Sequence, residues 1–367
     1  MKKKVLAVLL CAAMVMSMTA CGNSSTEEPA ETADTTEAAD DSTEAADESS
    51  DAAAAGGDFK IGLVTDVGGV NDGSFNQSAW EGLQRAAEEL GVEANYLESS
   101  TDADYTPNLE TFIDEEYDLI ISVGYMLADA TKAAAEANPD VKFAIIDDAT
   151  IELDNVTCLM FEQEQGSYLV GYVAGMMTET DNVGFVIGMS NENMNLFGYG
   201  YCAGVLDANP DATIQQFNVN SFADSATGKS MANTAITNGA DIVFHAAGAS
   251  GLGVIEACQE AGVYAIGVDS DQSSIAPETV ITSAMKRVDN AVYDSVEALI
   301  NGTLEGGVVT YDLSMGGVDI APTQDLLPEE VISAVEDVKQ QIIDGEIVVP
   351  NDQASFEAAH GDVYELD

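Results

Sequence analysis

The sequence predicts an α/β protein with two lobes, each a parallel sheet flanked by helices, and a ligand cleft between the lobes. Short apolar runs alternate with longer helical patterns from residue 58 to the end of the chain, an order typical of parallel sheets covered on both faces by helices. This part of the chain has roughly 310 residues, which is too many for one hydrophobic core. The ten predicted strands divide into five before Gln163 and five after it.

The elements follow in a regular order along the chain. The predicted strands are apolar runs of the kind that parallel sheets bury on both faces, at Lys60–Thr65, Val92–Leu97, Leu119–Val123, Phe143–Ile146, Val156–Met160, Val183–Ile187, Thr213–Phe217, Ile242–His245, Tyr264–Val268 and Val280–Ala284. Helical patterns fill the gaps, at Ser74–Leu90, Pro107–Glu116, Ala128–Asn138, Gln163–Thr178, Asn195–Asn209, Ser225–Asn238, Gly253–Ala261, Val288–Asn301 and Pro328–Ile343. We expect the first lobe to comprise residues 58–160 with 285–305, and the second 161–284 with 306–367.

The beginning of the chain has the pattern of a lipoprotein signal peptide. Lys2, Lys3 and Lys4 precede an apolar run, and Met-Thr-Ala stands directly before Cys21, as in the bacterial lipobox in which that Cys is lipidated. Residues 1–20 are therefore the predicted signal, and residues 21–57 an acidic disordered tether without aromatic or basic residues. We expect lipid on Cys21 to anchor the protein to the extracytoplasmic face of the cell membrane.

Composition excludes several classes of function. The chain has 65 acidic and 11 basic residues and a net charge of −54, so no nucleic acid is expected as a partner. With only His245 and His360 and no paired Cys spacing, no metal site is expected, and Cys158, Cys202 and Cys258 are predicted to be small buried hydrophobic residues.

Motifs for cofactors and catalysis also fail. Gly198–Ala203 matches a dinucleotide fingerprint, but its glycines do not follow a strand in a tight turn. The common signatures of NTPases, serine hydrolases and metalloproteases are absent from the sequence. We therefore expect no cofactor and no enzymatic activity.

The first strand, loop and helix form a unit with a polar end. The run Ile61–Val64 leads to Asp66, and Ser74 is predicted to cap the following helix. Ligands of open α/β sheets bind beyond the carboxyl ends of the strands, which is where the sequence places Asp66, Asn71, Asp72, Phe75 and Asn76. The alternative is that Phe75 only packs the helix start and that the acids are solvated caps.

Other strand ends supply further candidates. The first lobe contributes Gly124 and the pair Asp147-Asp148, and the second contributes Gly248 and Asp269. Adjacent strand residues point to opposite faces, so only one of Asp147 and Asp148 should reach the cleft. Lys286 follows the last predicted strand and is the one basic residue in this set.

Several of these segments together resemble a known family. Asp72-Gly-Ser-Phe-Asn76 and Ser283-Ala-Met-Lys-Arg-Val-Asp289 are the most specific of them, and Val64–Asp66, Ile145–Asp147, Gly200–Gly204 and Gly267–Gln272 add to the match. The chain resembles the BMP family of basic membrane protein lipoproteins from Lys60 to about Gly317. These are the substrate-binding components of ABC importers for nucleosides.

The resemblance implies a type I periplasmic-binding-protein fold and a nucleoside, with purines favoured, bound between the lobes. It implies that Phe75 stacks on the base with a second ring, for which Phe197 is expected while Phe217 and Tyr199 compete. Asp66 and Asp147 (or Asp148), with Asp269 and Lys286, are the implied polar partners near the ligand, and Gly248 suits a close backbone approach. A monomer that delivers its ligand to an ABC permease is expected. The alternatives are a sugar or furanone-signal binding protein and a nucleoside hydrolase using Asp66 or Asp147 as base.

Overall fold

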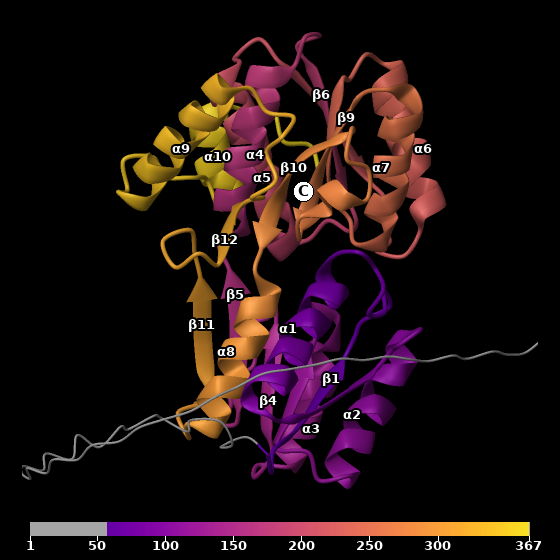
Figure 1. Ribbon diagram of the computed structural model, residues 1–367, viewed down its shortest axis with the longest axis vertical. Coiled ribbons are helices and arrows are strands. Elements are labelled where there is room, and N and C mark those ends of the chain that lie inside the picture. Colours follow the sequence, from indigo (N-terminus) through magenta and orange to yellow (C-terminus); the bar gives the residue numbers. More distant parts are fainter. Residues whose placement is uncertain (1–56, 367) are drawn as a thin grey trace, which may run out of the picture. The chain divides into compact units, whose positions relative to one another are not determined.

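The computed structural model describes residues 57–366, which form two six-stranded sheets with helices packed on their faces (Figure 1). We call each sheet with its helices a lobe. The predicted signal, Cys21 and nearly all of the predicted tether lie outside the described residues. Within the described residues, no helix combines the length and apolar character needed to cross a membrane.

The first sheet has the order β11-β5-β4-β3-β1-β2, and all its pairings are parallel. Its central strands consist mainly of apolar residues because helices cover both of their faces. Leu63 on β1 and Ile121 on β3 are fully buried neighbours in register. The strands are β1 (Lys60–Val64), β2 (Glu93–Leu97), β3 (Leu119–Ser122), β4 (Lys142–Ile146), β5 (Val156–Phe161) and β11 (Gly307–Tyr311).

The second sheet has the order β12-β10-β9-β8-β6-β7 and is parallel except for β12, which pairs antiparallel with β10. The parallel pairings align the carboxyl ends of its strands, so the residues that follow them gather at one edge. The strands are β6 (Asn182–Ile187), β7 (Thr213–Asn218), β8 (Ile242–Ala246), β9 (Tyr264–Asp269), β10 (Val280–Lys286) and β12 (Val318–Ile320).

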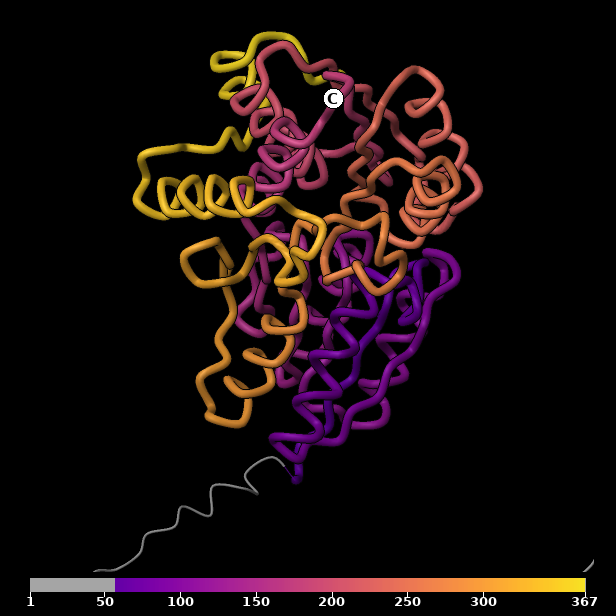
Figure 2. The backbone as a smooth tube through the Cα atoms, turned by 45° about the horizontal axis from the view of Figure 1, so that its top comes forward, coloured from indigo at the N-terminus to yellow at the C-terminus, as the bar shows by residue number. Residues whose placement is uncertain are grey.

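Helices cover the faces of both sheets. The longest of them alternate with the strands, and α9 and α10, near the end of the chain, pack against α4 and α5 of the second lobe, as the yellow segments of Figure 2 show. The helices are α1 (Phe75–Leu90), α2 (Tyr105–Asp114), α3 (Ala128–Ala137), α4 (Gln163–Met177), α5 (Glu192–Ala208), α6 (Ser225–Thr237), α7 (Ala249–Ala261), α8 (Val288–Ile300), α9 (Glu329–Ile343) and α10 (Gln353–His360).

The chain passes between the sheets three times. It leaves β5 for α4, returns from β10 to α8, which packs on α1, and crosses again between β11 and β12. These crossings can be followed in Figure 2. Each lobe is therefore assembled from segments that are distant in the sequence.

The predicted architecture is confirmed, with three omissions. All ten predicted strands are present within two residues of their expected bounds, and they divide between the sheets as expected. The sequence did not predict β11, β12 or α10. The expected second-lobe range 306–367 is wrong for β11, because this strand pairs with β5 in the first sheet.

The dinucleotide-like glycines have a packing role inside α5. A Cβ atom at Gly200 would lie 2.1 Å from the backbone oxygen of Glu164 on α4, and one at Gly198 would meet the Tyr364 ring. These glycines let α4 and the end of the chain approach α5 closely. Cys158, Cys202 and Cys258 are unpaired and buried, as predicted.

Candidate functional site

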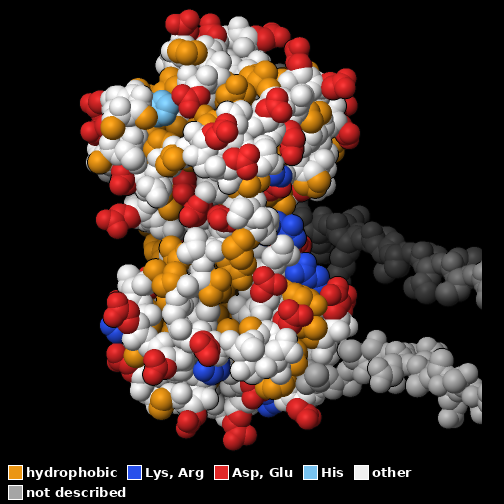
Figure 3. All heavy atoms as spheres, turned by 90° about the vertical axis from the view of Figure 1, so that its left-hand side faces the viewer, with side chains coloured by type: hydrophobic (Ala, Val, Ile, Leu, Met, Phe, Trp, Pro, Cys, Tyr) orange, Lys and Arg blue, Asp and Glu red, His pale blue; other side chains and the backbone are white. Residues whose placement is uncertain are grey.

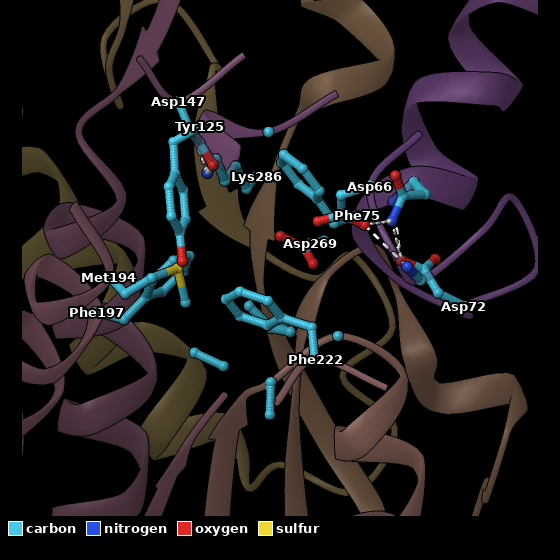
Figure 4. Close-up of a pocket in the computed structure, with 17 residues that line it drawn as sticks. Asp66, Asp72, Phe75, Tyr125, Asp147, Met194, Phe197, Phe222, Asp269 and Lys286 are labelled. Atoms are coloured by element: carbon cyan, nitrogen blue, oxygen red, sulfur yellow. Dashed lines mark hydrogen bonds and ion pairs between the residues drawn. The ribbon is translucent and has the colours of Figure 1, made fainter. Parts of the chain in front are cut away.

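A cavity lies where the carboxyl ends of the two sheets face each other. Its empty space, counted together with the solvent at its mouth, is about 520 Å³. Residues of both lobes line it, and Figure 4 shows their side chains converging on one space. They are Asp66, Gly68, Asp72, Phe75, Asn76, Gly124, Tyr125, Asp147, Met194, Phe197, Phe222, Ala246, Ala247, Gly248, Val268, Asp269 and Lys286.

Asp72 organises the start of α1. Its carboxylate accepts hydrogen bonds from the backbone N–H groups of Ser74 at 2.9 Å, Asn76 at 2.9 Å and Gln77 at 3.0 Å. These are N–H groups that a helix leaves unpaired at its N-terminus. Ser74 is the N-cap residue of α1, as predicted, but its side chain makes no cap bond. The Asp72 carboxylate, two residues earlier, accepts the hydrogen bonds of these N–H groups instead.

Asp66 follows β1 and is held beside Asp72 by one side chain. Asn76 donates its amide N–H to Asp66 at 2.7 Å and to Asp72 at 3.1 Å, and the backbone N–H of Gly68 donates to Asp66 at 3.0 Å. Burial raises the pKa of Asp66 to about 6, although these hydrogen bonds act in the opposite direction.

Asp147 and Lys286 form a buried ion pair between the lobes. The Lys286 Nζ atom lies 2.6 Å from both carboxylate oxygens of Asp147, and only 1% of Lys286 is exposed. Its ammonium is also 5.1 Å from the ring centroids of Phe75 and Phe161 and 5.6 Å from that of Phe197, within the range of cation–π attraction. The site's one cation is thus already paired with a carboxylate.

The choice between Asp147 and Asp148 is resolved by geometry. Asp147 lines the cavity, whereas the Asp148 carboxylate turns back to accept hydrogen bonds from the backbone and hydroxyl of Thr150. Asp147 reaches the cavity with φ at 67°, a left-handed conformation that is uncommon for residues other than glycine.

Asp269 ends β9 in the same left-handed conformation, with φ at 64°. Its carboxylate accepts a hydrogen bond from the Ser74 hydroxyl of the first lobe. Burial raises the pKa of Asp269 to about 7 despite the nearby positive charge of Lys286. At Asp269, burial therefore outweighs the opposing effect of the Lys286 charge on the pKa.

Aromatic side chains form the rest of the wall. Figure 4 shows Phe75 and Phe222 on opposite sides of the space that Asp269 faces. Phe222 also meets Tyr125 of the first lobe edge-on, with ring centroids 6.5 Å apart. Phe197 lines the cavity as well.

The other two candidates for a second ring lie elsewhere. Phe217 packs beside an apolar cluster of the second lobe, and Tyr199 contacts the rings of Phe356 and Tyr364. Neither lines the cavity. Phe222 was not among the predicted residues, although it lies in the loop after β7, and loops after parallel strands are where ligands bind.

Most predicted site residues are brought together, with two exceptions. Asn71 is exposed and lies outside the lining, and Asp148 faces away from it. Gly248 lines the cavity with φ at 54°, and a Cβ there would lie 3.2 Å from the backbone oxygen of Phe222. Tyr125 and Met194 are lining residues that the sequence did not predict.

The arrangement suits a neutral ligand with one flat apolar part and one part rich in hydroxyl groups. The rings offer apolar faces, and the buried carboxylates accept hydrogen bonds from hydroxyl donors. Among residues 57–366, no group of three His, Cys, Asp or Glu side chains is placed to hold a metal ion.

Comparison with known proteins agrees with this geometry. Residues 59–353 match the family described as ABC transporter substrate-binding protein PnrA-like. The chain is 40% identical over 315 residues to the CD4+ T-cell-stimulating antigen of Listeria monocytogenes, covering 80% of this chain and 88% of that protein.

Two further likenesses concern transport proteins. The ABC transporter nucleoside-binding protein BmpA of Lactococcus lactis is 36% identical over 316 residues, which cover 80% of this chain and 90% of that protein. A crystal structure of an ABC transporter solute-binding protein from Aeropyrum pernix is 28% identical, with a TM-score of 0.74, and the match covers 82% of this chain and 96% of that one.

Proposed function

This chain belongs to the PnrA-like family of ABC transporter substrate-binding proteins, and from that premise we propose that it captures nucleosides, with purine nucleosides preferred. Such a protein works with a ligand and a membrane permease, and the family is not one of enzymes. We propose that lipid on Cys21 anchors it at the extracytoplasmic face of the membrane. It would act as a monomer without catalysis.

The observation that carries the proposal is the pair of rings, Phe75 and Phe222, on either side of a space bordered by Asp269 (Figure 4). A neutral base presents two π faces, and stacking contributes about 1–3 kcal/mol per base. Hydroxyl groups of a ribose would donate to carboxylates, with each charge-assisted hydrogen bond contributing about 1.5–3 kcal/mol. A purine offers more stacking area than a pyrimidine, which supports the purine preference.

The surface is also compatible with a small ligand rather than a polyanion. On the face shown in Figure 3, acidic side chains are spread over both ends of the molecule and Lys and Arg side chains are few. Clustered basic side chains are what nucleic-acid binding requires.

Calorimetric titration with guanosine, adenosine, inosine and free ribose tests the proposal. Phe222→Ala should weaken nucleoside binding roughly tenfold to a hundredfold, the equivalent of a lost stacking contact. Phe217→Ala is the matched control, because it truncates a ring of the same lobe outside the cavity. The affinity of Phe197→Ala, measured in the same way, tests the ring that was predicted from the sequence to stack on the base.

Two outcomes would contradict the proposal. Equal affinities for ribose and nucleosides would show that the rings do not hold a base, and a sugar-binding protein would then fit better. Release of free hypoxanthine from inosine by the purified protein would indicate a hydrolase.

A further inference from the structure

Two hydrogen bonds join the lobes beside the cavity and run in opposite directions. Ser74 of the first lobe donates its hydroxyl to Asp269 of the second. Gln272, which begins a short 3₁₀ turn after β9, donates its amide N–H back to the Gly73 oxygen at 2.8 Å. Residues adjacent or nearly adjacent in sequence thus form a reciprocal contact across the cleft.

The Gln272 side chain is fixed to its own lobe before it reaches across. Its Oε1 atom accepts the backbone N–H of Val268 at 3.0 Å and lies 3.0 Å from Nε2 of His245. Its own backbone N–H donates to the Ser283 hydroxyl at 3.1 Å. Gln272 is 1% exposed, so these contacts leave the amide little freedom.

The backbone N–H of Val268 and the ring of His245 together set which way the Gln272 amide points. An amide oxygen only accepts hydrogen bonds, so the proton of His245 resides on Nε2. The Nδ1 atom then carries no proton, which agrees with its having no hydrogen-bond partner among the described residues. A Cβ atom at Gly251 would lie 2.0 Å from that Nδ1, so the ring is held in place by close packing. With the amide oxygen turned toward His245, its N–H group faces the first lobe.

We propose that Gln272, oriented by His245, forms with Ser74 a latch that holds the lobes closed over the ligand. The three are positioning residues, since they act by setting the fraction of molecules in the closed, binding-competent conformation. Apparent affinity falls in proportion to that fraction. Asp269 accepts the hydrogen bond of Ser74 and, under the proposed function, also faces the ligand. Closing the latch therefore positions a ligand-binding carboxylate beside the ligand.

The latch can be measured without any ligand. Spin labels at Ala133→Cys on α3 and Asn233→Cys on α6, both exposed, report the distance between the lobes, with Cys21→Ser in every variant. Gln272→Glu at pH 8 keeps the acceptor for Val268 and His245 but puts an oxygen opposite the Gly73 oxygen. Ser74→Ala removes the other bond, and Gln259→Leu on the exposed face of α7 is the control.

We expect the two latch variants to shift the ligand-free distance distribution toward longer distances, and the control to leave it unchanged. His245→Leu should have an intermediate effect, because the amide loses one of its two orienting contacts but keeps its donor. Nucleoside affinity should fall about 3- to 10-fold in each latch variant, as expected for one lost hydrogen bond, mainly through faster dissociation.

Only the expected effect of the latch on nucleoside affinity rests on the proposed function. Unchanged ligand-free distances in both Gln272→Glu and Ser74→Ala would refute it, whatever happens to binding. If the distances lengthen as expected but the wild-type protein binds no nucleoside, the latch stands and the proposed ligand is wrong. If one of the two latch variants loses the native circular dichroism spectrum, the distance measured for the other latch variant decides the test.

Discussion

Replacing Lys286 by Met should be strongly destabilising because it leaves Asp147 buried without its partner. The Lys286 Nζ atom lies 2.6 Å from both oxygens of a carboxylate that is itself only 6% exposed. Removing one member of a buried ion pair costs about 3–5 kcal/mol. The flexible Met side chain can occupy the space among the surrounding rings, so the loss reports mainly on charge.

The double variant Lys286→Met/Asp147→Asn separates the ion pair from the packing. Asn tolerates the left-handed backbone that Asp147 adopts, so this change removes the charge without adding backbone strain. We expect the double variant to recover at least about half of the lost stability, since replacing both charges of a buried pair is often close to neutral.

Thermal and urea unfolding followed by circular dichroism provide the measurement. A chain of this size shifts its Tm by about 2–4 °C per kcal/mol, so the single variant should melt about 6–20 °C lower. A single variant within about 1 °C of the wild type would refute the reasoning. So would a double variant less stable than either single one, because the two charges would then not be each other's main partners.

Three further results are expected. Burial raises the pKa values of Asp66 and Asp269 to about 6 and about 7, so the folded state binds protons more tightly than the unfolded state. The free energy of unfolding should therefore rise as pH falls from 8 to 5. Denaturant titrations across that range should show a weaker pH dependence for Asp269→Asn than for the wild type. Asp72→Ala should lower the free energy of unfolding by about 1–3 kcal/mol, because it leaves buried N–H groups at the start of α1 unpaired. Asp352→Ala, at the exposed start of α10, should lower it less in the same urea unfolding assay. At pH 8, calorimetry should show guanosine binding about a thousandfold more tightly than its 5′-monophosphate, because a doubly charged phosphate would meet ionised carboxylates in a closing cleft. Affinities within about fivefold of each other would contradict an acid-lined site.

The strands that sequence could locate are those buried on both faces. A run such as Leu119-Ile120-Ile121 is apolar throughout and fully buried, so it has one interpretation. The edge strand β11 has four exposed residues of five, and β12 has only three residues. Neither carries the buried run that marks a strand, so tertiary pairing, not local pattern, determines them.

The sequence predicted which residues lie in the site more successfully than it predicted the contacts between them. Strand ends correctly indicated that Asp66, Asp147 and Asp269 would converge, because parallel strands end at one edge. Sequence could not show that the Asp72 side chain caps the helix in place of the Ser74 side chain, since both residues can do so. It also could not pair Lys286 with Asp147, because that contact depends on how two lobes meet.

The distant origin of β11 has a consequence for how the molecule is made. Gly307 pairs with Thr157, so a chain emerging from its N-terminus completes β5 about 150 residues before its neighbour exists. Until then β5, whose side chains are almost all buried in the finished sheet, is an open, apolar edge of the kind that recruits other chains. We therefore expect folding to be slow and late, with aggregation most probable while this edge is bare. Substitutions that delay β11 should lower the yield of folded protein more than its final stability.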